Sequence, residues 1–214
     1  MKTKVMNDIE NQDYIISKKT SLKKTPEGLI YAARILITKN IKYLKDVELL
    51  SFYEYEKIVL MFDSDDEYKK NKELILESKR ALSKKNIQLL ISIKNTKKKD
   101  ISVYDFENKN EKEMIKIIKN AHLIYNLEVN DKRDKLNVPF SNFNQVYAKE
   151  FAMRNIILGI SIKSISEPRL IPRIRQNLKL ARKYKIPTIL SSFDENMIFG
   201  WYEAMQMLRV IVSR

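Results

Sequence analysis

Short apolar runs alternate along this chain with longer stretches in which apolar residues recur every three or four positions. The short runs are rich in Ile, Val, Leu and Tyr and predict buried strands, whereas the longer stretches have helical spacing. The predicted strands are Tyr14–Ser17, Arg34–Thr38, Lys57–Phe62, Ile87–Ile93, Ile101–Phe106, Ala121–Leu127, Asn155–Ile162 and Ile186–Ser192. The predicted helices are Glu67–Lys85, Glu111–Lys119, Phe143–Arg154, Arg169–Tyr184 and a last one around Trp201–Leu208.

Strands that alternate with helices in this way are typical of β/α units with a parallel sheet. Eight such strands favour a closed (β/α)₈-type barrel, for which 214 residues is close to the lower limit of about 200. An open doubly wound α/β sheet is the alternative. The chain has only three Gly and five Pro and no linker-like stretch, so we expect residues 1–214 to form a single α/β domain.

Composition excludes several classes of protein. The chain has no Cys and one His, which argues against disulfides, thiolate zinc sites and a Ser–His triad. No apolar run is long enough to span a membrane, and the first twelve residues lack the apolar core of a signal peptide. We therefore expect a soluble, cytoplasmic protein with no membrane partner.

The net charge of +14 is concentrated in two segments. Lys163–Lys185 has eight basic residues and one acid, and Glu77–Lys99 has the same balance, so each segment has a net charge of +7. The other 168 residues have 25 basic and 25 acidic side chains. Such a distribution indicates binding of a polyanion rather than a uniformly solubilised surface.

The Arg169–Tyr184 helix has two stripes. Apolar residues at steps of three or four predict a buried stripe, which consists of Ile171, Ile174, Leu178 and Ala181. A basic stripe beside it consists of Arg175, Lys179 and Arg182. An array of this kind can contact phosphates without reading bases, and the alternative is an ordinary solvated face.

Two other polar segments have a simpler explanation beside the functional one. Lys97, Lys98 and Lys99 lie in a predicted loop that could bind phosphate or only solubilise the protein. Asp63–Glu67 follows a strand, where carboxylates could hold Mg²⁺. Capping of the next helix by Ser64 or Asp65 is the better interpretation of this acidic segment.

Signatures of catalysis are absent from the sequence. There is no P-loop, no G-x-G-x-x-G and no nucleophile elbow. His122 opens an apolar strand and is expected to be structural, and Ser191 and Ser192 have no general base nearby in sequence. Near the C-terminus, core packing is favoured over a subunit contact for Met197, Phe199, Trp201, Met205 and Met207.

The segment from Lys135 to Ser192 resembles a known family. The matching pieces are NFNQVYAKEFAMRN, then IILGISIKSI with Gly159-Ile160-Ser161, then RQNLKLARKYKIPTILSS from Arg175. In this order they resemble protein component 3 of archaeal ribonuclease P, the counterpart of the eukaryotic thirty-kilodalton subunit. The first 130 residues match only through the alternation of strands and helices. This chain has Gln145 where many members have His, and it also differs at Phe193 and Ile198–Trp201.

The resemblance implies a compact TIM-like barrel and an RNA-binding subunit of the ribonuclease P holoenzyme, an endoribonuclease. It implies that the RNA removes 5′ leaders from precursor tRNA, with Mg²⁺ on the RNA and no cofactor or catalytic residue on this chain. The implied partners are ribonuclease P RNA, protein component 2 and precursor tRNA. The candidate RNA-binding residues are Lys97, Lys98, Lys99, Lys163, Arg169, Arg173, Arg175, Lys179, Arg182, Lys183 and Lys185. The alternatives are a free-standing Mg-dependent phosphoesterase barrel and a general RNA-binding protein.

Overall fold

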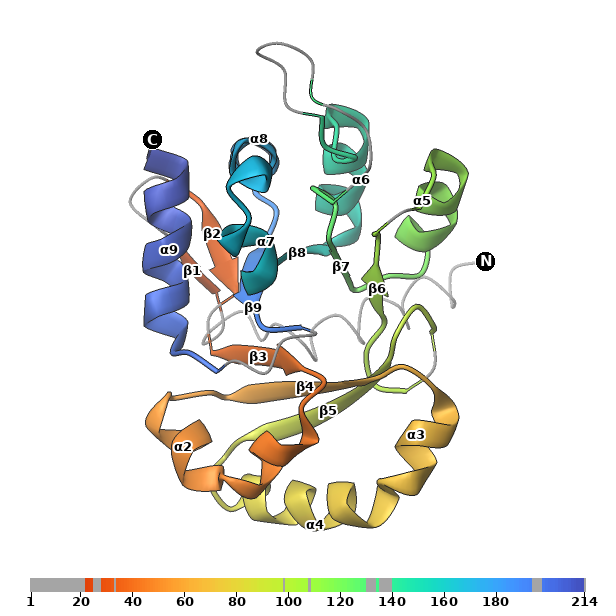
Figure 1. Ribbon diagram of the computed structural model, residues 1–214, viewed down its shortest axis with the longest axis vertical. Coiled ribbons are helices and arrows are strands. Elements are labelled where there is room, and N and C mark those ends of the chain that lie inside the picture. The colour runs from red at the N-terminus through yellow and green to blue at the C-terminus, as the bar shows by residue number, and fades with distance from the viewer. Residues whose placement is uncertain are drawn as a thin grey trace.

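The computed structural model describes residues 22–24, 28–32, 34–97, 99–107, 109–129, 134, 140–193 and 198–213 (Figure 1). Its strands are β1 Leu22–Lys24, β2 Ile30–Ala32, β3 Ile35–Thr38, β4 Lys57–Phe62, β5 Gln88–Ile93, β6 Val103–Asp105, β7 Leu123–Tyr125, β8 Ile157–Ser161 and β9 Thr188–Ser191. Its α-helices are α2 Val47–Phe52, α3 Asp65–Lys70, α4 Lys72–Ser83, α5 Glu111–Ile118, α6 Gln145–Arg154, α7 Ile162–Ser166, α8 Ile171–Tyr184 and α9 Trp201–Ser213. Two 3₁₀ helices, η1 Ile41–Lys45 and η2 Pro168–Leu170, precede α2 and α8.

The strands form two sheets. One has the order β1-β2-β9-β8-β7-β6 and the other has the order β3-β4-β5. All their pairings are parallel except that of β1 with β2. The predicted α/β architecture with parallel strands is therefore confirmed. In Figure 1 the two sheets lie one above the other, with α5, α6, α8 and α9 around the first and α2, α3 and α4 below the second.

Seven of the eight predicted strands are present, although most are shorter than expected. The eighth, Tyr14–Ser17, lies outside the described residues. The sequence analysis missed β1 and β2, which have only three residues each. Arg34 has a φ of 60° between β2 and β3, and this turn in the backbone lets β2 pair with β9 while β3 pairs with β4.

The predicted helix Glu67–Lys85 is wrong in one respect, because it consists of two helices. Asn71 ends α3, and its side-chain Nδ2 donates to the Glu67 carbonyl at 2.9 Å. Such a bond competes with continuation of the helix. The predicted last helix, in contrast, is longer than expected and continues to Ser213 with Ile211 and Val212 buried.

Strand residues are buried on both faces of the sheets, which is why their sequences are continuously apolar. In β4, Ile58 and Leu60 pack with α2 and α4, whereas Val59 and Met61 point the other way. That inner cluster draws residues from every strand from β2 to β9. Its members are Ala32, Ile35, Ile37, Val59, Met61, Leu90, Ile101, Val103, Leu123, Tyr125, Ile157, Ile189 and Phe193.

The two sheets also touch along their edges. Beyond the end of β9, the Phe193 amide donates to the Ile37 carbonyl at 2.9 Å, and the Lys39 amide donates to the Phe193 carbonyl at 3.0 Å. On the other side, the Asn95 amide donates to the Val103 carbonyl at 3.0 Å. Backbone hydrogen bonds therefore join β3 to the β9 end and the β5 end to β6.

Candidate nucleic-acid interface

The helix α8 is held in place by its apolar stripe. Ile174, Leu178 and Ala181 are fully buried, and the helix packs against α6 and α9. Pro172 lies in the first turn, where the missing amide hydrogen costs no hydrogen bond. The predicted buried stripe is thus confirmed, with Ile171 partly buried at its start.

The opposite side of α8 is basic. Lys179, Arg182 and Lys183 are exposed on it, and Lys185 follows at the C-cap. We call these four residues the α8 basic face. The sequence has no acidic residue between Glu167 and Asp194, so no acid on this helix neutralises the face. Its positive charge is therefore presented to solvent.

Two exposed cations lie before α8. Lys163 is in α7, and Arg169 is in η2. Arg169 forms an ion pair with Glu167, in which Nη2 lies 2.9 Å from Oε2. Exposed pairs of this kind are weak, on the order of 0–1 kcal/mol, so the pair leaves Arg169 able to exchange its partner for a phosphate.

Arg175 is only half exposed. Its Nε donates to the Ile211 carbonyl in α9 at 3.1 Å. Carbonyls in the last turn of a helix lack a partner within the helix, and Arg175 satisfies one of them. Of the predicted stripe, Lys179 and Arg182 face solvent, whereas Arg175 ties α8 to α9.

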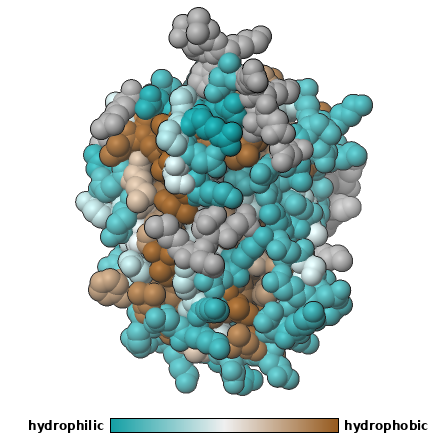
Figure 2. Space-filling model, in the orientation of Figure 1, coloured by the Kyte–Doolittle hydropathy of each residue, from teal (hydrophilic) through white to brown (hydrophobic). Residues whose placement is uncertain are grey.

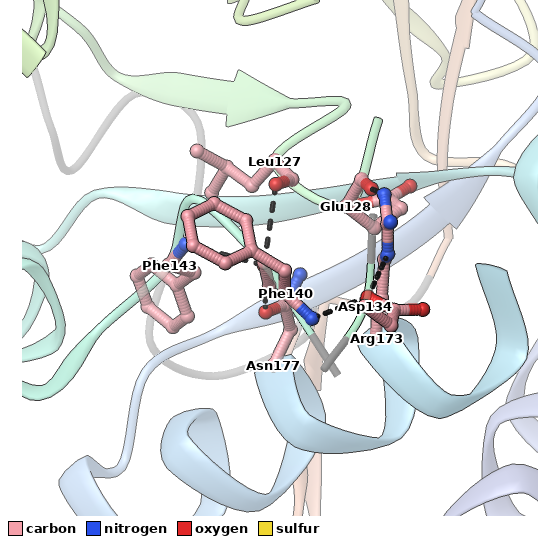
Figure 3. A network of polar contacts seen from close by, with 8 residues as sticks. Leu127, Glu128, Asp134, Phe140, Phe143, Arg173 and Asn177 are labelled. Carbon is pink, nitrogen blue, oxygen red and sulfur yellow. Dashed lines mark hydrogen bonds and ion pairs between the residues drawn. The ribbon is translucent and has the colours of Figure 1, made fainter. Parts of the chain in front are cut away.

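Arg173 is buried, so its prediction as an RNA-binding residue is wrong. Only 7% of its surface is exposed; its Nε donates to Asp134 Oδ1 at 2.8 Å, and its Nη1 donates to the Glu128 carbonyl at 3.1 Å (Figure 3). Partial burial alone would raise the pKa of Asp134, but the Phe140 amide and Arg173 lower it. We therefore remove Arg173 from the candidate interface, because its position at the third residue of α8 turns it toward the end of β7.

The predicted lysine loop is divided by the structure. Lys97 is exposed, and Lys98 lies outside the described residues. Lys99 pairs with Asp65, with 3.4 Å between Nζ and Oδ1, and its Nζ lies 3.8 Å from the centre of the Tyr68 ring. Lys99 is therefore held against α3, and of the two lysines of this loop that the structure describes, Lys97 is the one that keeps the expected exposed position.

The acidic segment caps a helix, as the favoured interpretation predicted. Ser64 Oγ accepts a hydrogen bond from the Glu67 amide at 3.2 Å, and Asp63 pairs with Lys39 at 2.7 Å. Hydrogen bonding to Lys69, together with the charge of Lys99, lowers the pKa of Asp65. Within the described part of the chain, no group of three or more His, Asp or Glu is placed to hold a metal ion.

His122 and the two serines also have structural roles. The Ser102 amide donates to His122 Nδ1 at 3.0 Å. Ser191 Oγ accepts from the Ile37 amide at 2.8 Å, and both Ser191 and Ser192 lie within hydrogen-bond distance of the Ile37 carbonyl. The hydroxyls therefore reinforce the contact between β9 and β3.

Sequence reasoning missed a buried polar cluster at the carboxyl ends of β5, β6 and β7. Asp105 accepts a hydrogen bond from Asn126 Nδ2 at 2.9 Å and pairs with Lys94 at 2.8 Å. Glu128 is fully buried nearby, and among the described residues neither of its carboxylate oxygens has a hydrogen bond of ordinary geometry. Burial raises the pKa of Glu128 to about 7, and Asp105 adds to the shift while Ser164 opposes it. The available signal was an acid directly after the apolar run that ends at Leu127.

Comparison with known proteins gives little to add to this geometry. No family model matches the chain, and no curated protein matches it. Among solved structures, it is similar to phospho-2-dehydro-3-deoxyheptonate aldolase from Thermotoga maritima, with 9% identity and a TM-score of 0.30. The match covers 87% of this chain and 52% of the aldolase, so the chain spans about half the length of that protein. A TM-score this low carries no argument about fold or function.

None of the helices in the described ranges is both long and apolar enough to cross a membrane.

Proposed function

We propose that this protein is a subunit of ribonuclease P that binds and supports the catalytic RNA during removal of 5′ leaders from precursor tRNA. The observation that carries the proposal is the α8 basic face, a row of exposed cations on a packed helix that has no acidic residue of its own. The resemblance of Lys135–Ser192 to ribonuclease P protein component 3 supports ribonuclease P RNA as the RNA that is bound.

The arrangement suits a structured RNA better than single-stranded bases. Double-stranded RNA is recognised mainly through its shape and its phosphates, whereas unpaired bases are usually stacked on aromatic rings. The α8 basic face has Lys and Arg side chains along one helix, and the one aromatic residue within α8, Tyr184, is only partly exposed. In this proposal the RNA carries out the hydrolysis with its own Mg²⁺, and protein component 2 is the protein partner.

We also propose that the two sheets form one compact TIM-like barrel, with the chain as a single domain. The hydrogen bonds between Ile37, Lys39 and Phe193 support closure on one side. The bond from Asn95 to Val103 supports it on the other side. The inner cluster, to which β2 through β9 contribute, would then be the interior of the barrel.

The function is tested with a charge-neutralising triple variant, Lys179→Gln, Arg182→Gln and Lys183→Gln. Lys183 takes the place of Arg175 in this set, because loss of the hydrogen bond from Arg175 to the Ile211 carbonyl would also disturb the packing of α8 on α9. We expect the plot of log affinity for ribonuclease P RNA against log salt to flatten by about 2 to 3 units of slope, since each phosphate contact contributes roughly 0.7–0.9. Cleavage of precursor tRNA by the reconstituted holoenzyme should fall at low Mg²⁺ and recover at higher Mg²⁺.

The matched control removes three exposed lysines from the neighbourhood of α5, with Lys112→Gln, Lys116→Gln and Lys119→Gln. If the α8 variant cleaves at low Mg²⁺ as well as this control does, the α8 basic face does not bind the RNA. Equal affinity of the unmodified protein for ribonuclease P RNA and an unrelated structured RNA at the same salt would instead indicate a general RNA-binding protein.

A further inference from the structure

The second basic segment of the sequence, Glu77–Lys99, contains a second exposed face that the candidate interface does not include. Three of its basic residues are neutralised by acids elsewhere in the fold. Lys85 pairs with Glu48 at 3.0 Å, Lys94 with Asp105 at 2.8 Å, and Lys99 with Asp65 at 3.4 Å. The segment is therefore less basic in the folded protein than its sequence suggests.

Most of the remaining positive charge of this segment lies at the end of α4. Lys79 and Arg80 are exposed in its last turns, and Lys84 is exposed at its C-cap. The structure gives these three side chains no ion pair with any residue in the described ranges. We call them the α4 basic face.

The spacing of these cations on α4 does not by itself stabilise the folded protein. Arg80 and Lys84 are four residues apart, so two like charges lie one above the other on the helix surface, and such pairs are mildly destabilising. Other lysines of the same segment, Lys85, Lys94 and Lys99, do form ion pairs with acids. Cations at a helix C-terminus do stabilise the helix dipole, and this is the explanation that a test must separate from binding.

The α4 and α8 basic faces are far apart on the molecule. The helix α4 lies under the β3-β4-β5 sheet at the bottom of Figure 1, whereas α8 packs on the other sheet in the upper half. Mostly hydrophilic residues cover the lower edge of the face shown in Figure 2.

We infer that the α4 basic face is a second RNA-binding surface, which contacts a segment of the same structured RNA distant from the segment bound by α8. The inference rests on the proposed function and deepens it. The occupant is RNA because the three exposed cations outnumber the one acid in the last turns of α4, Glu77, and so attract phosphates. The rest of the chain outside the two basic segments has no net charge.

The experiment compares three triple variants. The α4 variant is Lys79→Gln, Arg80→Gln and Lys84→Gln, and it is measured beside the α8 and α5 variants described above. The probe is full-length ribonuclease P RNA, with an unrelated structured RNA in parallel. The readouts are the salt dependence of affinity, backbone footprinting of the bound RNA with hydroxyl radicals, and thermal unfolding of each variant.

We expect the α4 variant to flatten the salt slope by about 2 to 3 units and to lose protection of one RNA segment. The α8 variant should lose protection of a different segment, and the α5 variant should change neither readout. An α4 variant that matches the α5 control in slope and footprint overturns the inference, whether or not its melting temperature falls. If the proposed function itself is wrong, the result is a different one: the unmodified protein binds the unrelated RNA as tightly as ribonuclease P RNA.

Discussion

Glu128 and Arg173 lie at the same end of β7, and they show how burial changes the role of a charged residue. Arg173 keeps its charge because Asp134 and the Glu128 carbonyl accept its hydrogen bonds. Among the described residues the Glu128 side chain has no cationic partner, and Figure 3 shows the guanidinium of Arg173 directed to Asp134. A carboxylate without a partner in a low-dielectric site favours its neutral form.

The folding stability should therefore depend on the protonation of Glu128. Its pKa is about 7 in the folded protein against 4.5 for an ordinary Glu, so the folded protein holds this proton more tightly than the unfolded chain. Stability from this group is fully present below about pH 4.5, falls as the pH rises to about 7, and stays low above that. A shift of this size corresponds to on the order of 3 kcal/mol.

Glu128→Gln removes this dependence, since Gln stays neutral. We expect the free energy of unfolding of the variant, relative to that of the unmodified protein, to be larger at pH 8 than at pH 5 by about 2.5 kcal/mol, so the variant gains relative stability at the higher pH. Urea unfolding at both pH values measures the difference. The control is Glu77→Gln on the exposed face of α4, and a difference that does not change between the two pH values would show that Glu128 is ionised in both states.

At the scale of elements, β8 depends on a residue without a side chain. Tyr125 in β7 stacks on Phe193 beyond β9, with ring centroids 4.2 Å apart and an interplanar angle of 9°. Gly159 lies in β8 between these strands. A Cβ at this position would come within 2.7 Å of Tyr125 Cβ and 2.8 Å of Phe193 Cζ. The stacked pair therefore occupies the space that any other residue would need.

Gly159→Ala should destabilise the protein by roughly 1–3 kcal/mol through overpacking. Denaturant unfolding measures this change. Gly28→Ala is a useful comparison, because its nearest neighbouring atoms are 3.9 Å away and its cost comes from a φ of +86° instead. A Gly159→Ala variant as stable as the unmodified protein would mean that the Tyr125–Phe193 stack is absent in solution.

Prediction from sequence succeeded for elements with strong periodicity. The strand Lys57–Phe62 and the helix that begins at Glu111 were placed correctly, because their apolar residues are continuous or regularly spaced. It failed at Asn71, since one side-chain hydrogen bond decides whether a helix continues. The basic character of α8 was also predicted, but not the burial of Arg173, which depends on Asp134 approaching from another part of the chain.

At the scale of the whole molecule, the proposed barrel depends on a few hydrogen bonds between the sheets. If the barrel is closed, the Phe193 and Lys39 amides should exchange with solvent about as slowly as the Leu158 amide, which donates to Pro187 between β8 and β9. Native-state hydrogen exchange measures all three. Fast exchange of Phe193 and Lys39 with slow exchange of Leu158 would support the open sheet instead.

The sequence by itself determined the alternation of strands and helices, the α/β class and the confinement of positive charge to two segments. These follow from local periodicity and composition, which need no knowledge of distant contacts. Only the tertiary structure decided which cations are available to a partner. Lys85, Lys94, Lys99 and Arg173 each meet an acid that the fold brings close, whereas Lys79, Arg80 and Lys84 of the α4 basic face pair with no acid among the described residues. The physical reason is that an ion pair depends on a distance of a few ångströms, and folding sets that distance between residues whose order along the chain does not reveal it.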